Sequence, residues 1–485
     1  MEALDRRIGA RSFARLLGDW RPPDGRGLAG ALADRVRLLV LDGRLPLQTR
    51  VPAERELAGA LGVSRTTVAA AYDALRDAAV LHSRRGSGSW TRLPADRAGT
   101  VAPSPFSPHG DRALFDLAHA ALPAPSEELR AAAAGALHDL DGLLGGHGYD
   151  LLGLPELRAA VARRYTERGL PTNPDQVLVT AGAQQAIALA LAGFTGPGDR
   201  VLVEQPTYPN ALEAITARGA RPVGLPLSDG WDLDLVAAAL RDAAPRLAYV
   251  IPDFQNPTGA VLDPGGRARL VELARRTGTP LVLDETLSEL WLDGPVPPPA
   301  ASFGAAEAAG VLTLGSASKV FWGGLRVGWI RGTAPTVRRL AALRAAVDLG
   351  SPALEQLLTA RLVHDLPAVT AGRRAALVTA RDGLRAALAT RFPAWRPSAP
   401  TGGLSFWIDL GDPVSSRLTV AARRHDVLLA AGPRFGIDGA FERYLRLPWT
   451  LRPDRVDEAL DRLATAWNTL DHLDAGVRPD PVAVA

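Results

Sequence analysis

Short apolar runs alternate with helical stretches rich in alanine, leucine and arginine from about Asp111 onward. Each run has the length of a strand and is bounded by turn residues, which is the pattern of strands buried inside a layered α/β fold. We expect buried strands at Gln176–Val179, Arg200–Glu204, Leu247–Ile251, Pro280–Asp284 and Val311–Leu314. The C-terminal body is therefore predicted to be an α/β domain.

The chain has 485 residues, enough for more than one hydrophobic core. Its proline-rich residues 93–110 read as an extended linker between two globular parts. We therefore expect an N-terminal extension (1–26), a small domain (27–92), a linker (93–113), the α/β body (114–475) and a tail (476–485).

Several classes of protein are disfavoured by composition. Cysteine is absent, which excludes disulfides and cysteine-based metal sites, and no metal site is expected. Residues 1–15 hold no apolar run of the kind found in signal peptides, and no stretch approaches 18 consecutive apolar residues. We therefore expect no membrane span, and a cytoplasmic location.

Charge is divided unevenly between the two parts of the chain. Residues 1–95 hold 16 Arg and 10 Asp or Glu, a balance of +6. Because the whole chain has a net charge of +3, residues 96–485 carry a net charge of −3. A small basic domain on an acidic body points to a polyanionic partner such as nucleic acid.

The small domain contains three helical stretches and a hairpin. Apolar spacing predicts a helix at Leu28–Leu41, a second from Pro52 to Leu61 and a third that Ser64 caps. A short turn containing glycine joins the last two, which is the signature of a helix-turn-helix. Residues 82–90 read as a two-stranded ribbon with a glycine-rich tip.

Polar residues of this domain lie where helix-turn-helix proteins contact DNA. The third helix begins with Arg65, Thr66 and Thr67, and the start of this helix enters the major groove. The ribbon tip would meet phosphates or the minor groove through Arg84, Arg85 and the backbone of Gly86.

The run GRLPLQTRVPAERELAGALGVSRTTVAAAYDAL, followed by RRGSGSW, closely resembles the winged helix-turn-helix of GntR-type bacterial regulators. This resemblance covers nearly the whole small domain and implies a mostly α fold that binds double-stranded operator DNA. It implies DNA contacts at Arg50, Arg55, Ser64, Arg65, Thr67 and the wing around Gly86.

Lys319 is the only lysine in the chain, and it stands in the segment Ser316-Ala317-Ser318-Lys319 directly after an apolar run. A lysine amine can lose its proton and attack a carbonyl, whereas a guanidinium stays charged and does not. A phosphorylated aldehyde cofactor needs such an amine together with groups that hold its phosphate, a task that suits Ser316, Ser318 and Arg326.

Three further segments fit the same cofactor. The turn at Gly182-Ala183 joins a strand to a helix, and backbone N–H groups at a helix N-terminus can approach a phosphate. Asp284 closes a strand, where a carboxylate can keep a cofactor ring nitrogen protonated. Asn256 could hydrogen-bond the ring hydroxyl.

The order of GAQQ, Tyr208, NPTG, the strand ending in Asp284, SASK and GLRVGW resembles fold-type I aminotransferases over roughly residues 115–470. Together with the N-terminal domain, the whole chain resembles the MocR subfamily of GntR regulators, in which an aminotransferase-like domain binds pyridoxal 5'-phosphate. The resemblance implies a Schiff base at Lys319, a pyridine partner at Asp284, a ring-hydroxyl partner at Asn256 and a stacking ring at Tyr208. It implies a phosphate site at Arg326, Ser316, Ser318, Gly182 and Ala183, and a grip for a substrate or effector carboxylate at Arg446.

Two positions depart from the family's pattern. Thr286 stands in the segment where a tyrosine usually follows the aspartate and bonds the cofactor's ring oxygen. Its shorter hydroxyl would tune the cofactor differently, so the sequence favours cofactor binding over efficient turnover. Asn210 stands where some relatives carry a second arginine, so no relative's effector is implied.

Three functions are compatible with these features. The leading interpretation is a transcription regulator that senses an amine, an amino acid or pyridoxal phosphate. The alternatives are a working aminotransferase with an autoregulatory DNA-binding domain, which the missing tyrosine disfavours, and a sensor whose lysine binds no cofactor, which the intact site disfavours. We also expect a homodimer that binds two half-sites, with the loop Gly148-Tyr149-Asp150 reaching a neighbour's cofactor.

Overall fold

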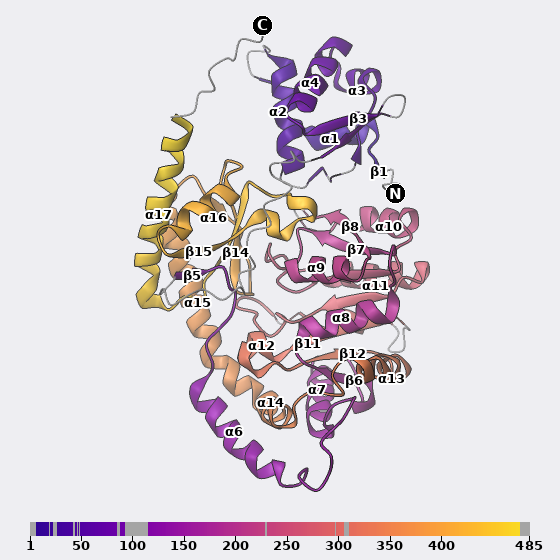
Figure 1. Ribbon diagram of the computed structural model, residues 1–485, viewed down its shortest axis with the longest axis vertical. Helices are drawn as coiled ribbons and strands as arrows, with labels where there is room; N and C mark the ends of the chain where they lie inside the picture. The colour runs from indigo at the N-terminus through magenta and orange to yellow at the C-terminus, as the bar shows by residue number, and fades with distance from the viewer. Residues whose placement is uncertain are drawn as a thin grey trace.

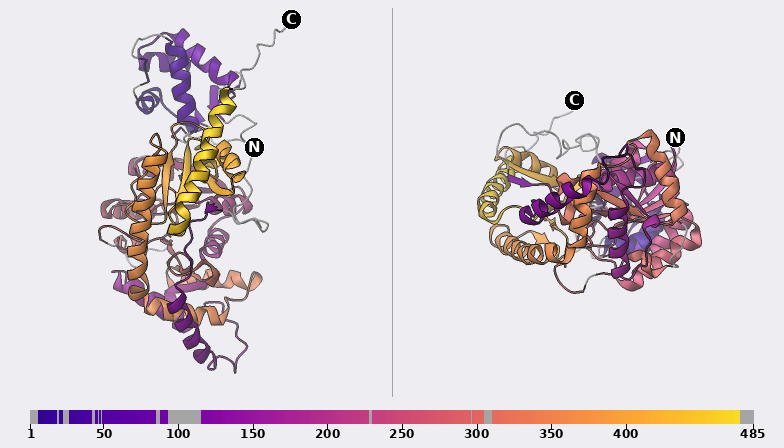
Figure 2. Two further views of the ribbon diagram at one scale, coloured as in Figure 1. Left: turned by 90° about the vertical axis from the view of Figure 1, so that its left-hand side faces the viewer. Right: turned by 90° about the horizontal axis from the view of Figure 1, so that it is seen from below.

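The computed structural model describes residues 6–18, 20–22, 27–41, 44–45, 47, 49–84, 88–92, 115–227, 230–295, 297–304 and 310–475. The expected linker and tail lie outside these residues, as do Arg85 and Gly86 and the side chain of Arg84. Two views show the N-terminal domain at one end of the molecule and a larger body beside it (Figure 1, Figure 2).

The N-terminal domain is a winged helix-turn-helix, as the sequence predicts. Its elements are β1 (Arg6–Arg7), α1 (Ala10–Leu17), α2 (Leu28–Leu41), β2 (Thr49–Arg50), α3 (Glu54–Leu61), α4 (Arg65–Asp77), β3 (Leu81–Arg84) and β4 (Gly88–Thr91). Strands β3 and β4 pair antiparallel and form the wing, and the sheet order is β1-β2-β4-β3. The left-handed backbone of Gly62 (φ +63°) ends α3 and begins the turn into α4.

This domain begins earlier than the predicted boundary at residue 27. Helix α1 buries Phe13 and Leu17 completely in the same core as Val36 and Val68. Arg35 fixes the end of α1, because its Nε donates to the carbonyl of Leu17 at 2.7 Å. Arginines surround the short apolar face of α1 in the sequence. The composition of this segment therefore predicts an extension and not a part of the domain.

The larger body is built on a sheet of seven strands with the order β6-β12-β11-β10-β9-β7-β8. These strands are β6 (Val177–Thr180), β7 (Arg200–Gln205), β8 (Arg221–Pro226), β9 (Leu247–Val250), β10 (Leu281–Asp284), β11 (Val311–Ser316) and β12 (Gly328–Arg331). Within the described residues of this sheet, only β12 pairs antiparallel with its neighbours. Five of the seven strands are those that the apolar runs predict.

Helices cover both faces of this sheet, because its strands bury residues on both sides (Figure 1). The helices of this layer structure are α6 (Ser126–Leu140), α7 (Pro155–Glu167), α8 (Ala183–Phe194), α9 (Pro209–Ala217), α10 (Leu233–Asp242), α11 (Pro264–Thr277), α12 (Ala317–Val320), α13 (Ala334–Leu343) and α14 (Ala353–His364). On β9, Ala248 and Val250 pack with α7, α10 and α11, whereas Leu247 and Tyr249 pack with α8, α9 and α13. Short 3₁₀ turns lie at η1 (Pro174–Gln176), η2 (Ala300–Phe303), η3 (Gly323–Leu325) and η4 (Arg344–Ala346).

A second sheet of five strands, in the order β13-β14-β16-β15-β5, completes the body. Its elements are β5 (Phe115–Leu117), α15 (Leu366–Arg391), β13 (Arg396–Pro397), β14 (Ser405–Asp409), α16 (Ser415–Arg423), β15 (Val427–Ala431), η5 (Gly432–Phe435), η6 (Ile437–Gly439), β16 (Tyr444–Pro448) and α17 (Pro453–Ala475). The three helices pack on one face, around Phe406 and Leu445. No helix in the described ranges is long and apolar enough to cross a membrane.

Candidate functional site

The carboxyl ends of β10 and β11 bring the predicted cofactor residues to one edge of the large sheet. These strands run parallel with Asp284 opposite Leu314, and β11 ends at Ser316, where α12 begins. In open α/β sheets ligands bind at this edge, outside the carboxyl ends of the strands. Asp284 and Lys319 therefore face one region, although 35 residues of sequence separate them.

The amine of Lys319 lies among charged groups from both parts of the body. Its Nζ donates to the carbonyl of Ala120 at 2.7 Å. Burial and the nearby Arg446 lower the pKa of Lys319 to about 8, whereas Asp284 opposes this shift. An amine with this pKa is unprotonated in a useful fraction of molecules near neutral pH, which is the form that attacks a carbonyl.

A cradle for an anion lies where Arg326 meets the start of α8. Gly182 precedes this helix with φ +85°, and a Cβ at this position would lie 2.6 Å from Arg326 Nη2. Gly328 is equally constrained, since a Cβ there would lie 2.8 Å from the amide nitrogen of Ala183. The first N–H groups of α8 have no side-chain cap, so the helix N-terminus can bind a phosphate.

The two predicted serines take different positions. Ser318 lies beside Arg326, whose Nη1 approaches its hydroxyl at 3.5 Å. Ser316 is buried, and its hydroxyl accepts a hydrogen bond from the amide of Ser318 at 3.1 Å as the cap of α12. Ser318 therefore opens toward the cradle, whereas Ser316 supports the turn that carries Lys319.

Asp284 is held by two donors, one of which the sequence analysis missed. The Tyr249 hydroxyl donates to Oδ2 of Asp284 at 2.5 Å, and the amide of Thr286 donates to Oδ1 at 3.0 Å. Strand alternation could have placed Tyr249 on this face, but the register between β9 and β10 decides the contact. Tyr208 also lies nearby: burial and the charge of Asp284 raise the pKa of its hydroxyl to about 12.

Arg446 enters the same region from β16 in the smaller sheet. Its Nη1 donates to Asn256 Oδ1 at 3.2 Å, its Nη2 donates to the carbonyl of Ala118, and its guanidinium lies 4.9 Å from the ring centre of Phe435. Burial lowers the pKa of Arg446 to about 10, so it stays charged at neutral pH. Its Nε has no hydrogen-bond partner among the described residues. The side chain can thus bind a carboxylate without losing its existing contacts.

The residues at this edge of the sheet match the chemical groups of pyridoxal phosphate. The cradle at Gly182 and Arg326 matches a phosphate, the carboxylate of Asp284 matches a pyridinium, and the amine of Lys319 matches an aldehyde. Asn256 contacts Arg446 beside these groups, and Tyr208 lies near Asp284. The residues therefore suit the cofactor in kind and in arrangement.

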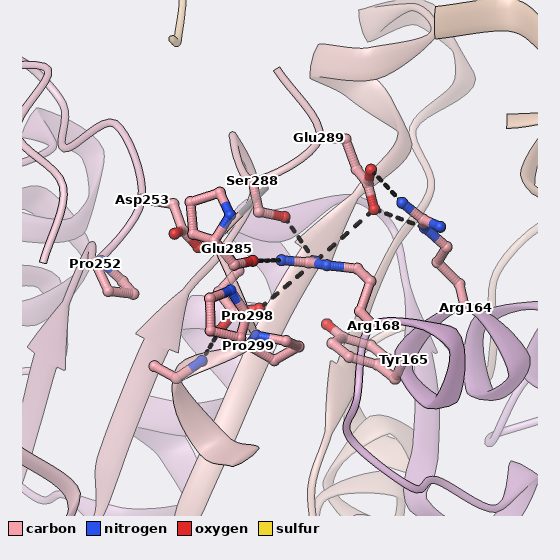
Figure 3. A network of polar contacts seen from close by, with 12 residues as sticks. Arg164, Tyr165, Arg168, Pro252, Asp253, Glu285, Ser288, Glu289, Pro298 and Pro299 are labelled. Atoms are coloured by element: carbon pink, nitrogen blue, oxygen red, sulfur yellow. Dashed lines mark hydrogen bonds and ion pairs between the residues drawn. The ribbon is translucent and has the colours of Figure 1, made fainter. Parts of the chain in front are cut away.

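Behind this edge lies a buried network of arginines and carboxylates that the sequence analysis did not anticipate (Figure 3). Arg168 donates to Ser288 Oγ at 3.0 Å, and its Nη1 lies 3.9 Å from Glu285 Oε2. Glu285 is 3% exposed, and its Oε1 accepts from the amide of Ala300 at 2.8 Å. Burial and the nearby Asp253 raise the pKa of Glu285 to about 7.

The network borders a cavity of about 30 Å³, which is room for a water molecule or two. Thr286 and Ser316 line this cavity together with Arg168 and Glu285. The cavity therefore separates the predicted cofactor edge from the buried charges behind it.

The N-terminal domain presents its predicted DNA-contacting residues at the start of α4 and beside it. Ser64 caps the helix by accepting from the amide of Thr67 at 3.0 Å, and its hydroxyl also pairs with those of Thr66 and Thr67. The side chain of Arg65 is 73% exposed and approaches Glu54 at 3.4 Å. These residues form an exposed polar helix start.

The two remaining predicted contacts lie on neighbouring elements. Arg55 is exposed on α3, and the guanidinium of Arg50 lies 5.8 Å from the ring centre of Trp90 in the wing. An exposed arginine at the start of a recognition helix is the arrangement that contacts duplex DNA in the major groove.

Comparison with known proteins assigns each domain to a family. Residues 28–90 match the family described as bacterial regulatory proteins, gntR family, and residues 125–463 match aminotransferase class I and II. The uncharacterized HTH-type transcriptional regulator YisV of Bacillus subtilis (strain 168) is 28% identical over 90% of this chain and 95% of its own length.

Two further proteins are similar to a large part of the chain. MocR of Rhizobium meliloti, named as a probable rhizopine catabolism regulatory protein, is 33% identical over 62% of this chain and 64% of its own length. The crystal structure of LysN, the α-aminoadipate aminotransferase of Thermus thermophilus, in complex with N-(5'-phosphopyridoxyl)-L-leucine, has a TM-score of 0.68 and 30% identity. That match covers 74% of this chain and 93% of the LysN chain.

Proposed function

This chain belongs to the MocR-type GntR transcription regulators, and from this premise we propose that its aminotransferase-like domain holds pyridoxal 5'-phosphate on Lys319 and senses an amine, an amino acid or the cofactor itself. The observation that carries the proposal is the convergence of Lys319, Asp284 and Arg326 at one edge of the large sheet. Each of these side chains suits a different part of the cofactor.

When bound, pyridoxal phosphate supplies an aldehyde that exchanges between amines and a ring that withdraws electrons. Arg326, Ser318 and the first amides of α8 would hold its phosphate, and Asp284 would hold the proton at its ring nitrogen. Tyr208 would face the ring, and Asn256 would orient the ring hydroxyl. Lys319 would provide the resident amine, and Arg446 would hold the carboxylate of an incoming amino acid through a bidentate contact.

A role in transcription further implies that the N-terminal domain binds a duplex operator, with Arg65 at base edges and the wing at phosphates. This DNA-binding role is the basis for expecting a cytoplasmic protein. A ligand would then act by changing the affinity of the protein for its operator.

We also propose that the protein acts as a homodimer. Exposed apolar side chains gather on two adjoining loops: Tyr149 is 67% exposed, Val347 66% and Leu349 44%. The loops touch, because Arg344 Nη1 donates to the carbonyl of Leu151 at 3.1 Å. Such a patch favours a partner surface, and a second copy would cover it symmetrically.

The patch also adjoins the proposed cofactor site. Asp348, between its two apolar residues, accepts a hydrogen bond from Gln185, and the amide of Ala181 donates to Gln185 Oε1 at 2.6 Å. A partner on this face would therefore lie next to the phosphate cradle. Tyr149 is the candidate residue that reaches across.

A working aminotransferase is the second candidate, and the intact set of Lys319, Asp284 and Arg446 favours it. Thr286 opposes it, since its side chain cannot place a phenol at the ring oxygen. We therefore propose a regulator with at most a residual half-reaction, rather than a dedicated enzyme.

The test is a measurement of operator affinity with and without ligands. A binding site is first selected from random duplexes, and the affinity of the full chain is then measured alone, with pyridoxal phosphate, and with the cofactor plus a panel of amines and amino acids. We expect at least one combination to change the affinity fivefold or more, on the order of 1 kcal/mol of coupling. Lys319→Arg keeps the charge but cannot form an imine, so it should abolish this change. An equal response in the natural protein and in Lys319→Arg would refute sensing through the cofactor.

A further inference from the structure

Tyr249 and Asp284 lie on the same face of the large sheet for a reason that follows from strand geometry. Tyr249 on β9 pairs with Val282 on the parallel strand β10, and side chains two residues apart on a strand point to the same face. Asp284 therefore lies diagonally across from Tyr249. The long phenol spans this diagonal, and both residues are buried, with 2% and 4% exposure.

The hydrogen bond between them is short and joins a phenol donor to a carboxylate acceptor. The Tyr249 hydroxyl donates to Asp284 Oδ2 at 2.5 Å, within the range of O–H···O⁻ bonds, which are roughly twice as strong as neutral ones. Oδ1 of the same carboxylate accepts from the amide of Thr286 at 3.0 Å. Each oxygen thus has one protein donor and keeps a further lone pair.

We propose that Tyr249 is a positioning residue that orients Asp284 and keeps its carboxylate ionised, so that the proton of the Asp284–ring nitrogen pair stays on the cofactor. This inference rests on the proposed function, because it needs pyridoxal phosphate at Asp284. Hydrogen bonds donated to the charged form of an acid favour that form, and without them a buried carboxyl tends to become neutral.

The groups around Tyr249 support a permanent donor. Burial and the charge of Asp284 raise the pKa of its hydroxyl well above the ordinary value, so it does not ionise in the physiological range. Tyr208 and Glu204 are the other titratable groups that influence it, and both shift the Tyr249 pKa in the same direction. Tyr249 therefore remains able to donate throughout the pH range in which the protein would work.

In this proposal, the ring nitrogen and the ring oxygen of the cofactor differ in the protein groups that contact them. At the ring nitrogen, Tyr249 and the Thr286 amide complete the setting of Asp284. At the ring oxygen, the family's usual phenol is missing, since Thr286 occupies that segment. The chain would thus keep a charged ring while lacking one of the groups that tune proton transfer at the neighbouring carbon.

The test compares Tyr249→Phe with the natural protein and with Tyr165→Phe. Tyr165 is a matched control because it is also buried in the body, but its hydroxyl contacts Trp329 Nε1 at 3.2 Å instead of Asp284. Each protein is loaded with pyridoxal phosphate, and its visible absorption is titrated with pH. A ring nitrogen that loses its proton no longer disfavours protonation of the conjugated nitrogen at Lys319. We therefore expect Tyr249→Phe to raise the apparent pKa at which the visible absorption of the bound cofactor changes, by about one pH unit. The same change should weaken cofactor binding about tenfold at pH 6.

The possible outcomes separate this inference from the proposed function. If Tyr249→Phe and Tyr165→Phe both titrate and bind like the natural protein, the role of Tyr249 is refuted while the cofactor site stands. If the natural protein binds no pyridoxal phosphate, both are refuted.

A second measurement needs no cofactor. A double-mutant cycle on chemical unfolding with Tyr249→Phe and Asp284→Asn should be non-additive, because the two groups share one buried bond. Additive effects would contradict the assignment. The double-mutant cycle tests the bond between Tyr249 and Asp284 even if Tyr249→Phe is too unstable to bind the cofactor.

Discussion

Arg446 donates from Nη1 to Asn256 Oδ1 at 3.2 Å, which joins the proposed carboxylate grip in the smaller sheet to the proposed ring contact in the larger one. In the proposed function, a ligand held at Arg446 would therefore lie against Asn256, the residue proposed to orient the cofactor. Through this contact a bound amino acid would affect the cofactor ring without a complete set of catalytic groups.

Transamination is expected to be slow or absent, although amines should exchange at the cofactor. Exchange needs Lys319, the phosphate cradle and the grip at Arg446, whereas moving protons on the substrate carbon needs tuned acid–base groups around the ring. Stopped-flow and product assays over a panel of amino acids should show spectral exchange with few turnovers. Thr286→Tyr should increase turnover. Multiple turnover by the natural protein near the ~10 s⁻¹ typical of enzymes would favour the aminotransferase interpretation instead.

Arg65 is predicted to read a base. Its side chain is exposed at the start of α4, so Arg65→Ala should cost about 1–3 kcal/mol on the specific site and reduce discrimination. A phosphate contact behaves differently, because its loss weakens all sequences alike and flattens the salt dependence. Arg55→Ala on the neighbouring helix is the comparison. Equal losses for Arg65→Ala on specific and scrambled duplexes would refute base readout.

Most of the proposed cofactor residues could be singled out from the sequence because they lie in short motifs at strand ends. Gly182 and Lys319 follow β6 and β11, and Arg326 precedes β12, which lies between these strands and pairs antiparallel with both. Tyr249 could not be assigned in this way, since its contact depends on the register between two strands. Helix α1 was missed because only two of its residues, Phe13 and Leu17, are buried, and they stand among arginines, which gives too weak a pattern.

A dimer is predicted in solution. The exposed apolar residues Tyr149 and Val347 should lie at its interface, so Val347→Asp should shift sedimentation toward the monomer at micromolar concentration. Val420→Asp is the control, because Val420 is similarly exposed, at 62%, on α16, which packs on the five-stranded sheet of the body. A natural protein that sediments as a monomer with full cofactor occupancy would rule the dimer out.

Stability is predicted to fall as the pH rises from 5 to 8. The pKa of Glu285 is about 7 in the folded chain, whereas an ordinary glutamate titrates near 4.5. A raised pKa means that the folded state binds the proton more tightly, so this stabilisation is complete below about pH 4.5 and is lost as the pH passes 7. Glu204, with a pKa of about 8, acts in the same direction.

Glu285→Gln should therefore reduce the slope of unfolding free energy against pH, by an amount on the order of 1–3 kcal/mol across this range. Urea denaturation at several pH values measures the slope. Glu213→Gln serves as the control, because that side chain is 64% exposed. Identical slopes for the natural protein and Glu285→Gln would show that the buried network does not titrate as described.

The most direct test of the account is to locate the cofactor on the chain. The purified protein is incubated with pyridoxal phosphate, reduced with borohydride and digested, and the labelled peptide is sequenced by mass spectrometry. Lys319 is the only lysine, so the label should fall on the peptide that contains it, and Lys319→Ala should lose both the label and the visible band. A label on the N-terminal amine alone, or no label in the natural protein, would contradict the central claim that Lys319 holds the cofactor.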